Sequence, residues 1–407
     1  MKKIGLFLGV SASSGGMFQY SQSMLAAVAA LPRASFSVVV AYTDPLWRQH
    51  IARYQVDSVY IDSGQWSIML SKLWRGMGLS NRLWRLIAPL FHPVVRTLIQ
   101  DQCNLWIFPA QDAWSYQAPV PSVGTIHDLM HRYERRFPEV SAMGRYYIRE
   151  RHFRDMCKWS KAVLVDSEYG KGQVQESYQL DPQKIFPLPY VRPQYIYDSR
   201  PSPDFDKKYN LPNKFIFYPA QFWRHKNHIR LLRAIAKLKQ CQGDIALVLV
   251  GSNKNGYQDA IQAIDQLGLK ERVRILGYVP DEDIAELYRR ARALVMPTFF
   301  GPTNIPPLEA FVLGCPVAIS DIYGVREQVK DAALLFNPES VEEITEVIHK
   351  LWIDDALCAH LTESGKKRAQ EWGQEDFNQT LLAILGQLTC DQNEFRKVVS
   401  DKRTTTA

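Results

Sequence analysis

The chain alternates short apolar runs with longer amphipathic stretches, and the alternation occurs twice. In the first half, runs rich in β-branched and aromatic residues predict strands at 3–9, 36–41, 58–61, 105–108, 122–126 and 162–165. Most of these runs are continuously apolar, and helical patterns separate them. This arrangement is typical of a parallel sheet that helices cover on both faces.

The second half repeats the pattern more regularly. It predicts strands at 215–218, 246–250, 273–276, 293–296, 316–319 and 333–336, and helices at 227–238, 259–267, 281–290, 307–313 and 341–352. We therefore predict an α/β protein with two Rossmann-like, doubly wound domains facing a cleft. The predicted boundaries are 1–195 and 214–375 for the domains, 196–213 for a proline-rich linker, and 376–407 for a helix and polar tail. Ligands of such domains bind at the carboxyl ends of the strands.

Composition places the chain among ordinary globular proteins. Its 407 residues are 46% hydrophobic and 22% charged, which is enough for two cores. No apolar run approaches the ~18–20 residues of a membrane-spanning helix. We interpret the apolar run 4–10 as a buried strand rather than a short signal peptide. Six scattered cysteines without a CxxC pair fit a reducing, cytoplasmic location.

The net charge of +7 is unevenly distributed. Residues 1–200 hold 23 Lys and Arg against 15 Asp and Glu, whereas the remainder holds 26 against 27. The excess predicts an anionic partner for the first half. Acidic residues are absent between Asp62 and Asp101, while 64–98 contain Trp66, Trp74 and Trp84 with Lys72, Arg75, Arg82, Arg85 and Arg96.

Such a stretch suits an amphipathic segment lying on an anionic membrane surface. The alternative is a pair of helices packed on the first domain with their cations in water. Nucleic acid is not expected as a partner, because no nucleic-acid-binding module is present.

Two candidate sites lie in the first half. Gly15-Gly16 separates the first predicted strand from a helix, where glycines allow an anion to approach helix N–H groups; a plain loop explains them equally well. His127-Asp128 directly follows the strand predicted at 122–126. An imidazole at a strand end can act as a base or bind a sugar hydroxyl, and a carboxylate can orient it. A purely structural histidine remains the alternative.

Two further sites lie in the second half. Arg224, His225 and Lys226 precede a predicted helix, where a cationic loop suits a pyrophosphate. The stretch 300–310, FGPTNIPPLEA, starts another helix. There the amides of Asn304 and Ile305 can bind an oxygen anion, and Glu309 can accept both hydroxyls of a ribose. A solvated basic loop and a structural proline-rich helix start are the respective alternatives.

Together these motifs resemble the family-4 retaining glycosyltransferases of GT-B fold. The resemblance covers roughly residues 3–375 and also draws on 165–168 (VDSE), 250–251 (VG), 277–280 (GYVP) and 306–310 (PPLEA). It implies a nucleotide-sugar donor held mainly by the second domain, a saccharide or lipid-linked acceptor held mainly by the first, and no metal or other cofactor. The motif GPTNIPPLEA resembles that of a bacterial subgroup active on surface polysaccharides. The favoured donor is a GDP-mannose-like sugar nucleotide.

Residue roles follow from the resemblance. It implies that Lys226 contacts the donor diphosphate, that Glu309 holds the ribose diol, and that His127 lies near the reacting sugar on the acceptor side. The stretch around Asn304 and Ile305 would meet phosphate and sugar through backbone amides. Further donor contacts are implied at Gly15, Gly16, Arg224, Gly251, Tyr278, Val279 and Thr303, and the catalytic set is His127, Asp128 and Glu309.

Two positions depart from the family pattern. Gly301 stands where the family has the first glutamate of its paired-glutamate motif, and Gln221 stands where it has a diphosphate-binding arginine. Arg224 can replace that charge from a shifted position. The departures leave open a non-catalytic subunit that binds sugar nucleotides or glycans. An epimerase or phosphorylase of the same fold is less favoured, since no pyridoxal lysine motif is found.

Overall fold

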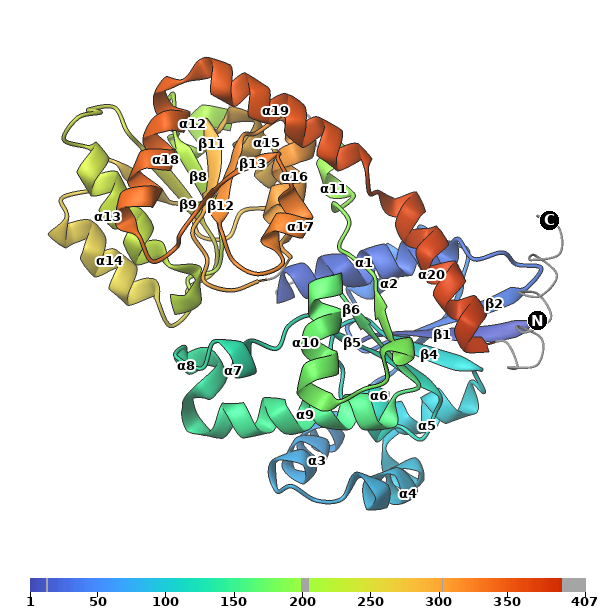
Figure 1. Ribbon diagram of the computed structural model, residues 1–407. Helices are drawn as coiled ribbons and strands as arrows, with labels where there is room; N and C mark the ends of the chain where they lie inside the picture. The colour runs from blue at the N-terminus through green and yellow to red at the C-terminus, as the bar shows by residue number, and fades with distance from the viewer. Residues whose placement is uncertain (12–13, 199–204, 302, 390–407) are drawn as a thin grey trace. The chain divides into compact units, whose positions relative to one another are not determined.

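The computed structural model describes residues 1–11, 14–198, 205–301 and 303–389, and the chain divides into two compact units. Unit 1 comprises Met1–Leu129, Tyr146–Pro189 and the chain from Gln374, whereas unit 2 comprises Met130–Arg145 and Tyr190–Gly373. Figure 1 shows both as α/β domains. Most of the predicted polar tail and residues 199–204 of the predicted linker lie outside the described residues.

Unit 1 is built on a seven-stranded parallel sheet. Its strands are β1 (Lys2–Leu8), β2 (Phe36–Tyr42), β3 (Asp57–Tyr60), β4 (Leu105–Phe108), β5 (Ser122–Ile126), β6 (Ala162–Val165) and β7 (Ile185–Pro187), in the order β3-β2-β1-β4-β5-β6-β7. The six predicted strands are confirmed. The edge strand β7 was not predicted, because three residues ending in a proline carry too little pattern.

The helices of unit 1 follow from its amphipathic stretches. They include α1 (Gly16–Ala29), α2 (Trp47–Ile51), α3 (Gln65–Gly76), α4 (Asn81–Phe91), α5 (Pro93–Gln100), α6 (Trp114–Gln117), α9 (Arg145–Trp159), α10 (Glu168–Tyr178) and α20 (Gln374–Thr389). Central strands are fully buried, as in β4 with its sequence LWIF. Gly5 of β1 is required because a Cβ there would lie 2.3 Å from the Trp106 ring.

Unit 2 is a second doubly wound domain with a six-stranded parallel sheet. Its strands are β8 (Ile216–Pro219), β9 (Leu247–Val250), β10 (Val273–Ile275), β11 (Ala293–Met296), β12 (Val317–Ser320) and β13 (Ala333–Phe336), in the order β10-β9-β8-β11-β12-β13. Helices α13 (His228–Leu238), α14 (Tyr257–Gln266) and α18 (Val341–Ile353) cover one face, and α15 (Asp281–Arg290), α16 (Ile305–Leu313) and α19 (Asp355–Gln370) the other (Figure 1). Shorter helices are α11 (Tyr195–Asp198), α12 (Phe205–Tyr209) and α17 (Val325–Val329). All the strands and helices predicted in this half are confirmed within a few residues.

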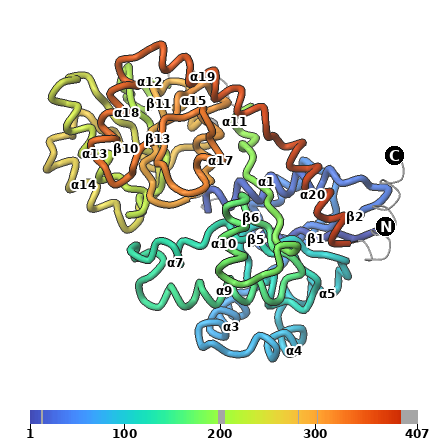
Figure 2. Tube along the Cα trace, in the orientation of Figure 1, coloured from blue at the N-terminus to red at the C-terminus, as the bar shows by residue number. Residues whose placement is uncertain are grey.

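Two segments belong to a different unit from their neighbours in sequence, and Figure 2 traces both along the chain. Helix α20 joins unit 1, where Phe377 packs 5.7 Å from the Tyr20 ring of α1 and the Gln374 amide donates to the Ser23 carbonyl at 3.0 Å. Residues 130–145, which we call the arm, join unit 2. The arm carries α7 (Met130–Tyr133), α8 (Pro138–Ser141) and η2 (Ala142–Gly144).

Strand order fixes where sites can form. In each sheet the order reverses once, between β1 and β4 in unit 1 and between β8 and β11 in unit 2. Loops that leave adjacent strands in opposite directions at such a switch point leave room for a ligand at the carboxyl edge. The sequence alone does not give this order, so the two switch points are findings of the structure.

Candidate active site

The cationic loop of unit 2 leaves β8 at the switch point. Arg224, His225 and Lys226 form a single 3₁₀ turn, η4 (Arg224–Lys226), in which the Lys226 amide donates to the Trp223 carbonyl at 3.0 Å. Asn227 ends the turn with a left-handed backbone, at φ 60°. Asparagine tolerates this conformation better than most residues. The turn therefore concentrates three basic side chains just before α13.

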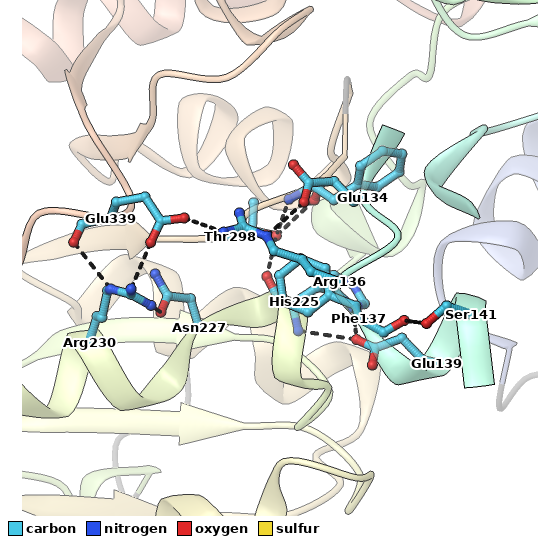
Figure 3. A network of polar contacts seen from close by, with 11 residues as sticks. Glu134, Arg136, Phe137, Glu139, Ser141, His225, Asn227, Arg230, Thr298 and Glu339 are labelled. Carbon is cyan, nitrogen blue, oxygen red and sulfur yellow. Dashed lines mark hydrogen bonds and ion pairs between the residues drawn. The ribbon is translucent and has the colours of Figure 1, made fainter. Parts of the chain in front are cut away.

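The loop after β11 is bonded directly to this turn. The Phe299 amide donates to the His225 carbonyl at 2.8 Å, and the Asn227 side chain donates to the carbonyls of Pro297 and Pro338, each at 2.9 Å. Figure 3 shows His225 and Asn227 near Arg230, which pairs with Glu339 at 2.6 Å. The two loops that flank the switch point of unit 2 are therefore held against each other by backbone and amide contacts.

Glu309 lies on α16 and is buried, with 5% of its surface exposed. Its two carboxylate oxygens accept hydrogen bonds from the hydroxyls of Tyr195 and Tyr288, the latter at 2.7 Å. Burial raises the pKa of Glu309 to about 7, against the opposing effect of the two tyrosine hydrogen bonds. Each carboxylate oxygen has a second lone pair, so the group can still accept a diol.

The amide of Asn304 corrects one expectation. It donates to the Gln328 side chain at 3.0 Å, and the Gln328 amide donates back to the Asn304 carbonyl at 2.6 Å. The Asn304 amide is therefore already engaged in a buried pair. Ile305 begins α16, and the two prolines that follow carry no N–H. The start of this helix offers an anion fewer donors than the sequence prediction assumed.

Gly301 and Gln221 have structural reasons for departing from the family pattern. Gly301 has φ 124°, a conformation that favours glycine, and a Cβ there would lie 2.7 Å from the Asn304 side chain. The side-chain amide of Asn304 instead donates to the Gly301 carbonyl at 2.8 Å. The Gln221 side chain accepts from the Trp223 indole at 2.9 Å, which fixes the start of the cationic loop. Both positions are integrated into the local structure.

The remaining predicted donor residues of unit 2 are spread around the same edge. Arg224 forms an ion pair with Asp259 at 3.0 Å, and both side chains are exposed. Gly251, after β9, must be glycine because a Cβ would lie 2.3 Å from the Ala220 carbonyl oxygen. Tyr278 is 80% exposed, whereas Val279 is buried in the core. Because the Val279 side chain is buried, only the backbone of this residue is available to a ligand. Thr303 lies in the bend before α16.

His127 directly follows β5 in unit 1 and is almost fully buried. Its Nε2 lies 2.8 Å from the Pro109 carbonyl, which follows β4. Since a carbonyl only accepts, Nε2 carries the proton. Burial lowers the pKa of His127 to about 4, so the ring is neutral at neutral pH. The Tyr20 ring packs edge-on against it at 5.0 Å.

The other predicted site residues of unit 1 are Asp128, Gly15 and Gly16. Asp128 pairs with Arg149 of α9 at 2.7 Å, so the carboxylate that was expected to orient the histidine also holds a cation. The Pro109 carbonyl contributes to the orientation of His127. Gly15, at φ 59°, precedes α1, and Gly16 is its first residue. These glycines follow β1, so the predicted residues of unit 1 lie after strands at or next to its switch point.

Three residues of the site were not predicted from the sequence. Tyr195 and Tyr288 bind Glu309 from segments 114 and 21 residues away. Glu139 of the arm binds His225 from 86 residues away. No local motif marks such contacts. Within the described residues, no group of three or more His, Cys, Asp or Glu side chains is arranged to hold a metal ion.

Comparison with known proteins shows which proteins parts of this chain resemble. Residues 201–368 match the family model described as glycosyl transferases group 1. The O-antigen chain mannosyltransferase RfbU of Salmonella typhimurium is 30% identical over 220 residues, covering 53% of this chain and 56% of that protein. The O-antigen chain mannosyltransferase B of Escherichia coli is 26% identical over 244 residues, covering 59% and 64%. The matches thus span less than two thirds of either relative.

A solved structure extends the likeness to nearly the whole fold. The crystal structure of Anabaena Alr3699/HepE in complex with UDP superposes with a TM-score of 0.68 at 18% identity, covering 95% of this chain and all of that one. Identity this low is informative about the fold alone. The two doubly wound domains have the GT-B fold of this solved structure.

Proposed function

We propose that the protein transfers a hexose, with mannose from a GDP sugar favoured, to a saccharide or lipid-linked saccharide acceptor with retention of configuration. One observation carries the proposal. Lys226 and Glu309 follow β8 and β11, the two strands that flank the switch point of unit 2. In this proposal the cationic turn binds the diphosphate of a nucleotide, and the Glu309 carboxylate binds its ribose. The mannosyltransferase relatives support the choice of sugar.

The chemistry of transfer fits these residues. Cleavage of the bond between the anomeric carbon and the diphosphate places negative charge on the leaving phosphate. Lys226 and Arg224 can stabilise that charge, which would make a metal ion unnecessary. In retaining transfer the acceptor hydroxyl attacks from the face that the diphosphate leaves, so the leaving phosphate can take its proton. His127, neutral at neutral pH, then serves as a hydrogen-bonding group for a sugar hydroxyl rather than as a cation.

The non-catalytic alternative receives no support from the relatives, which are named as transferases. The two departures that suggested it, Gly301 and Gln221, are explained by local backbone and side-chain contacts. Purified protein offered GDP-, UDP- and dTDP-sugars with a saccharide acceptor tests the point. We expect release of the nucleoside diphosphate and an axial new bond by proton NMR for mannose. Binding without release in all three series would favour the non-catalytic subunit.

Attachment to an anionic membrane through residues 64–98 is the second part of the proposal. Helices α3 and α4 are adjacent, since the rings of Trp74 and Trp84 lie 5.4 Å apart (Figures 1 and 2). Apolar side chains nevertheless face outward, with Trp66 83%, Leu86 75% and Leu90 79% exposed. A groove of about 530 Å³ runs along α3. Among the described helices, none combines the length and apolar character needed to span a bilayer.

The structure narrows which residues can meet lipid. Trp84 is fully buried, and Arg85 donates to the carbonyls of Tyr116 and Ala118 at 2.8 and 2.6 Å, so both stabilise the domain. Lys72 and Arg82 are exposed. Each cation near an anionic surface contributes about 1 kcal/mol. Changing both to Gln should reduce co-sedimentation with anionic liposomes at low salt. The matched control changes Lys237 and Arg233 on α13, and equal pelleting of all proteins would argue for helices that only pack on unit 1.

A further inference from the structure

The arm places a buried carboxylate against the cationic turn of unit 2. Glu139, on the short helix α8, has only 6% of its side chain exposed. Its Oε1 accepts from the His225 ring at 2.6 Å and from the His225 amide at 3.1 Å, and its Oε2 accepts from the Asn255 side chain at 2.9 Å. Figure 3 shows Glu139 directed at His225. One carboxylate therefore contacts two loops, those after β8 and β9.

Asn255 extends this connection to the other side of the turn. While its amide nitrogen donates to Glu139, its oxygen accepts the backbone N–H of Arg224 at 3.1 Å. Glu139 thus restrains His225 directly, and it restrains Arg224 through Asn255. The His225 carbonyl is held in turn by Phe299. The backbone from Arg224 to His225 is fixed by the arm, by the loop after β9 and by the loop after β11.

The charge of Glu139 suits this position. Burial alone would raise the pKa of a carboxyl group, but the hydrogen bonds from His225 and Asn255 outweigh it and hold the pKa of Glu139 at about 2. The group is therefore an anion throughout the neutral range. It contacts His225 in the turn that also carries the cations Arg224 and Lys226, whose like charges would otherwise favour spreading the loop apart.

The arm itself is anchored independently of Glu139. The Phe137 ring packs 5.5 Å from the Phe299 ring, the Arg136 guanidinium lies 4.5 Å above Phe299, and Arg136 also pairs with Glu339. Loss of the Glu139 carboxylate should consequently leave the arm bound to unit 2. An effect of substituting Glu139 can then be assigned to the carboxylate rather than to detachment of the arm.

We propose that Glu139 is a positioning residue for donor binding: it acts through His225 and Asn255 to hold the cationic turn in the conformation that receives a nucleoside diphosphate. The inference rests on the proposed function, because it takes this turn as the diphosphate site. Glu139 itself does not touch the ligand. A carboxylate that contacted the diphosphate would oppose its binding, whereas one bonded behind the turn organises the cations without facing the phosphates.

Calorimetric binding of GDP, UDP and dTDP to the full chain tests the inference, with Glu139→Ala, Glu139→Gln, His225→Ala and the Glu139→Ala/His225→Ala double variant. Losing charge-assisted contacts from an organised site should weaken binding of the preferred nucleotide roughly tenfold in Glu139→Ala. Glu139→Gln keeps one acceptor oxygen and should lose less. If Glu139 acts mainly through His225, adding Glu139→Ala to His225→Ala should cost about twofold or less. Glu342→Gln, a surface carboxylate paired with Lys237, is the matched control.

Hydrogen exchange of the His225 amide supplies a readout that needs no ligand. This amide donates to Glu139, so its exchange should accelerate in Glu139→Ala and not in Glu342→Gln. Unchanged nucleotide affinity in Glu139→Ala would overturn the inference while the proposed function stands, and full additivity with His225→Ala would remove His225 from it. A wild-type protein that binds none of the three nucleotides would overturn the proposed function and this inference with it.

Discussion

The two switch points of the molecule fix their polar side chains in different ways. In unit 1, His127 is buried, neutral and bonded to the backbone carbonyl of Pro109. In unit 2, a basic turn is connected through its backbone to two neighbouring loops and to the carboxylate of Glu139. A neutral imidazole suits the hydroxyls of a sugar, whereas an organised cationic turn suits a diphosphate. The same fold thus presents two different chemistries at equivalent places in its sheets.

The largest expected effect concerns the charge of unit 2. Lys226→Ala should reduce kcat/KM for sugar transfer roughly ten- to a hundredfold, because one charge-assisted phosphate contact contributes about 1.5–3 kcal/mol. The melting temperature should stay close to that of the wild type, since a loop side chain contributes little core packing. Steady-state kinetics with the preferred donor measure this. Lys237→Ala, an exposed lysine of the same unit, is the control. Equal rates for the two variants would remove Lys226 from the site.

Glu309 predicts a dependence of stability on pH. Burial raises its pKa above the value in the unfolded chain, so the folded state favours the protonated form. Its contribution to stability is present below about pH 4.5 and is lost as the pH rises through about 7, a change of a few kcal/mol at most. Denaturant unfolding of the wild type and Glu309→Gln from pH 4 to 8 measures the difference.

The glutamine variant lacks this titration and can accept from one tyrosine hydroxyl and donate to the other, which makes it preferable to Glu309→Ala. Removing the side chain would leave the buried Tyr288 hydroxyl without its acceptor, at a cost of about 1–3 kcal/mol. We therefore expect Glu309→Ala to lower the free energy of unfolding. A constant difference in unfolding free energy across the pH range would show that Glu309 does not titrate as proposed.

Restoring the family glutamate should harm this chain. Gly301→Glu places a side chain at φ 124° and against Asn304, so the free energy of unfolding should fall by about 1–3 kcal/mol. Thermal unfolding measures the loss. The control is Gly172→Glu on α10, where a Cβ meets open space and glycine is a poor helix former. A Gly301→Glu protein as stable as the wild type would mean that the backbone does not dictate this departure.

A smaller effect is expected in unit 1. His127→Asn should lower kcat about tenfold by removing one hydrogen bond to a sugar hydroxyl, while nucleotide affinity changes less than twofold. Transfer kinetics and nucleotide binding, measured on the same protein, separate the two. His360→Asn, an exposed histidine of α19, is the control. A large loss of nucleotide affinity in His127→Asn would contradict the division of roles between the two switch points.

Chelation should have no effect. In the proposed function the cationic turn stabilises the leaving phosphate without a metal ion, so transfer in excess EDTA should match the untreated rate. Complete loss of activity that Mn²⁺ or Mg²⁺ restores would contradict this. Helix α15 begins at Asp281, where the sequence predicted a helix start, and Pro280 holds the capping position.

The sequence was informative where a signal is local. Continuous apolar runs predicted twelve of the thirteen strands, and strand-end motifs placed Lys226, Glu309 and His127 after β8, β11 and β5. The missed features depend on contacts between distant segments. Tyr195 and Tyr288 occupy the Glu309 carboxylate, and Gln328 occupies the Asn304 amide.

The domain boundaries illustrate the same limit. The arm follows β5 in sequence but packs on unit 2 through Phe137 and Glu139, and α20 follows unit 2 but packs on unit 1 through Phe377. Periodicity identifies α20 as a helix but not the unit that buries its apolar face. The strand order, and with it each switch point, likewise follows only from the folded chain.

Calorimetric titration of the preferred nucleoside diphosphate into wild type, Lys226→Ala and His127→Asn tests the central claim most directly. The claim is that the switch point of unit 2 binds the donor through its cationic turn. It predicts at least tenfold weaker binding in Lys226→Ala and nearly unchanged binding in His127→Asn. Unchanged affinity in Lys226→Ala, with loss in His127→Asn, would contradict the claim and move the nucleotide to unit 1.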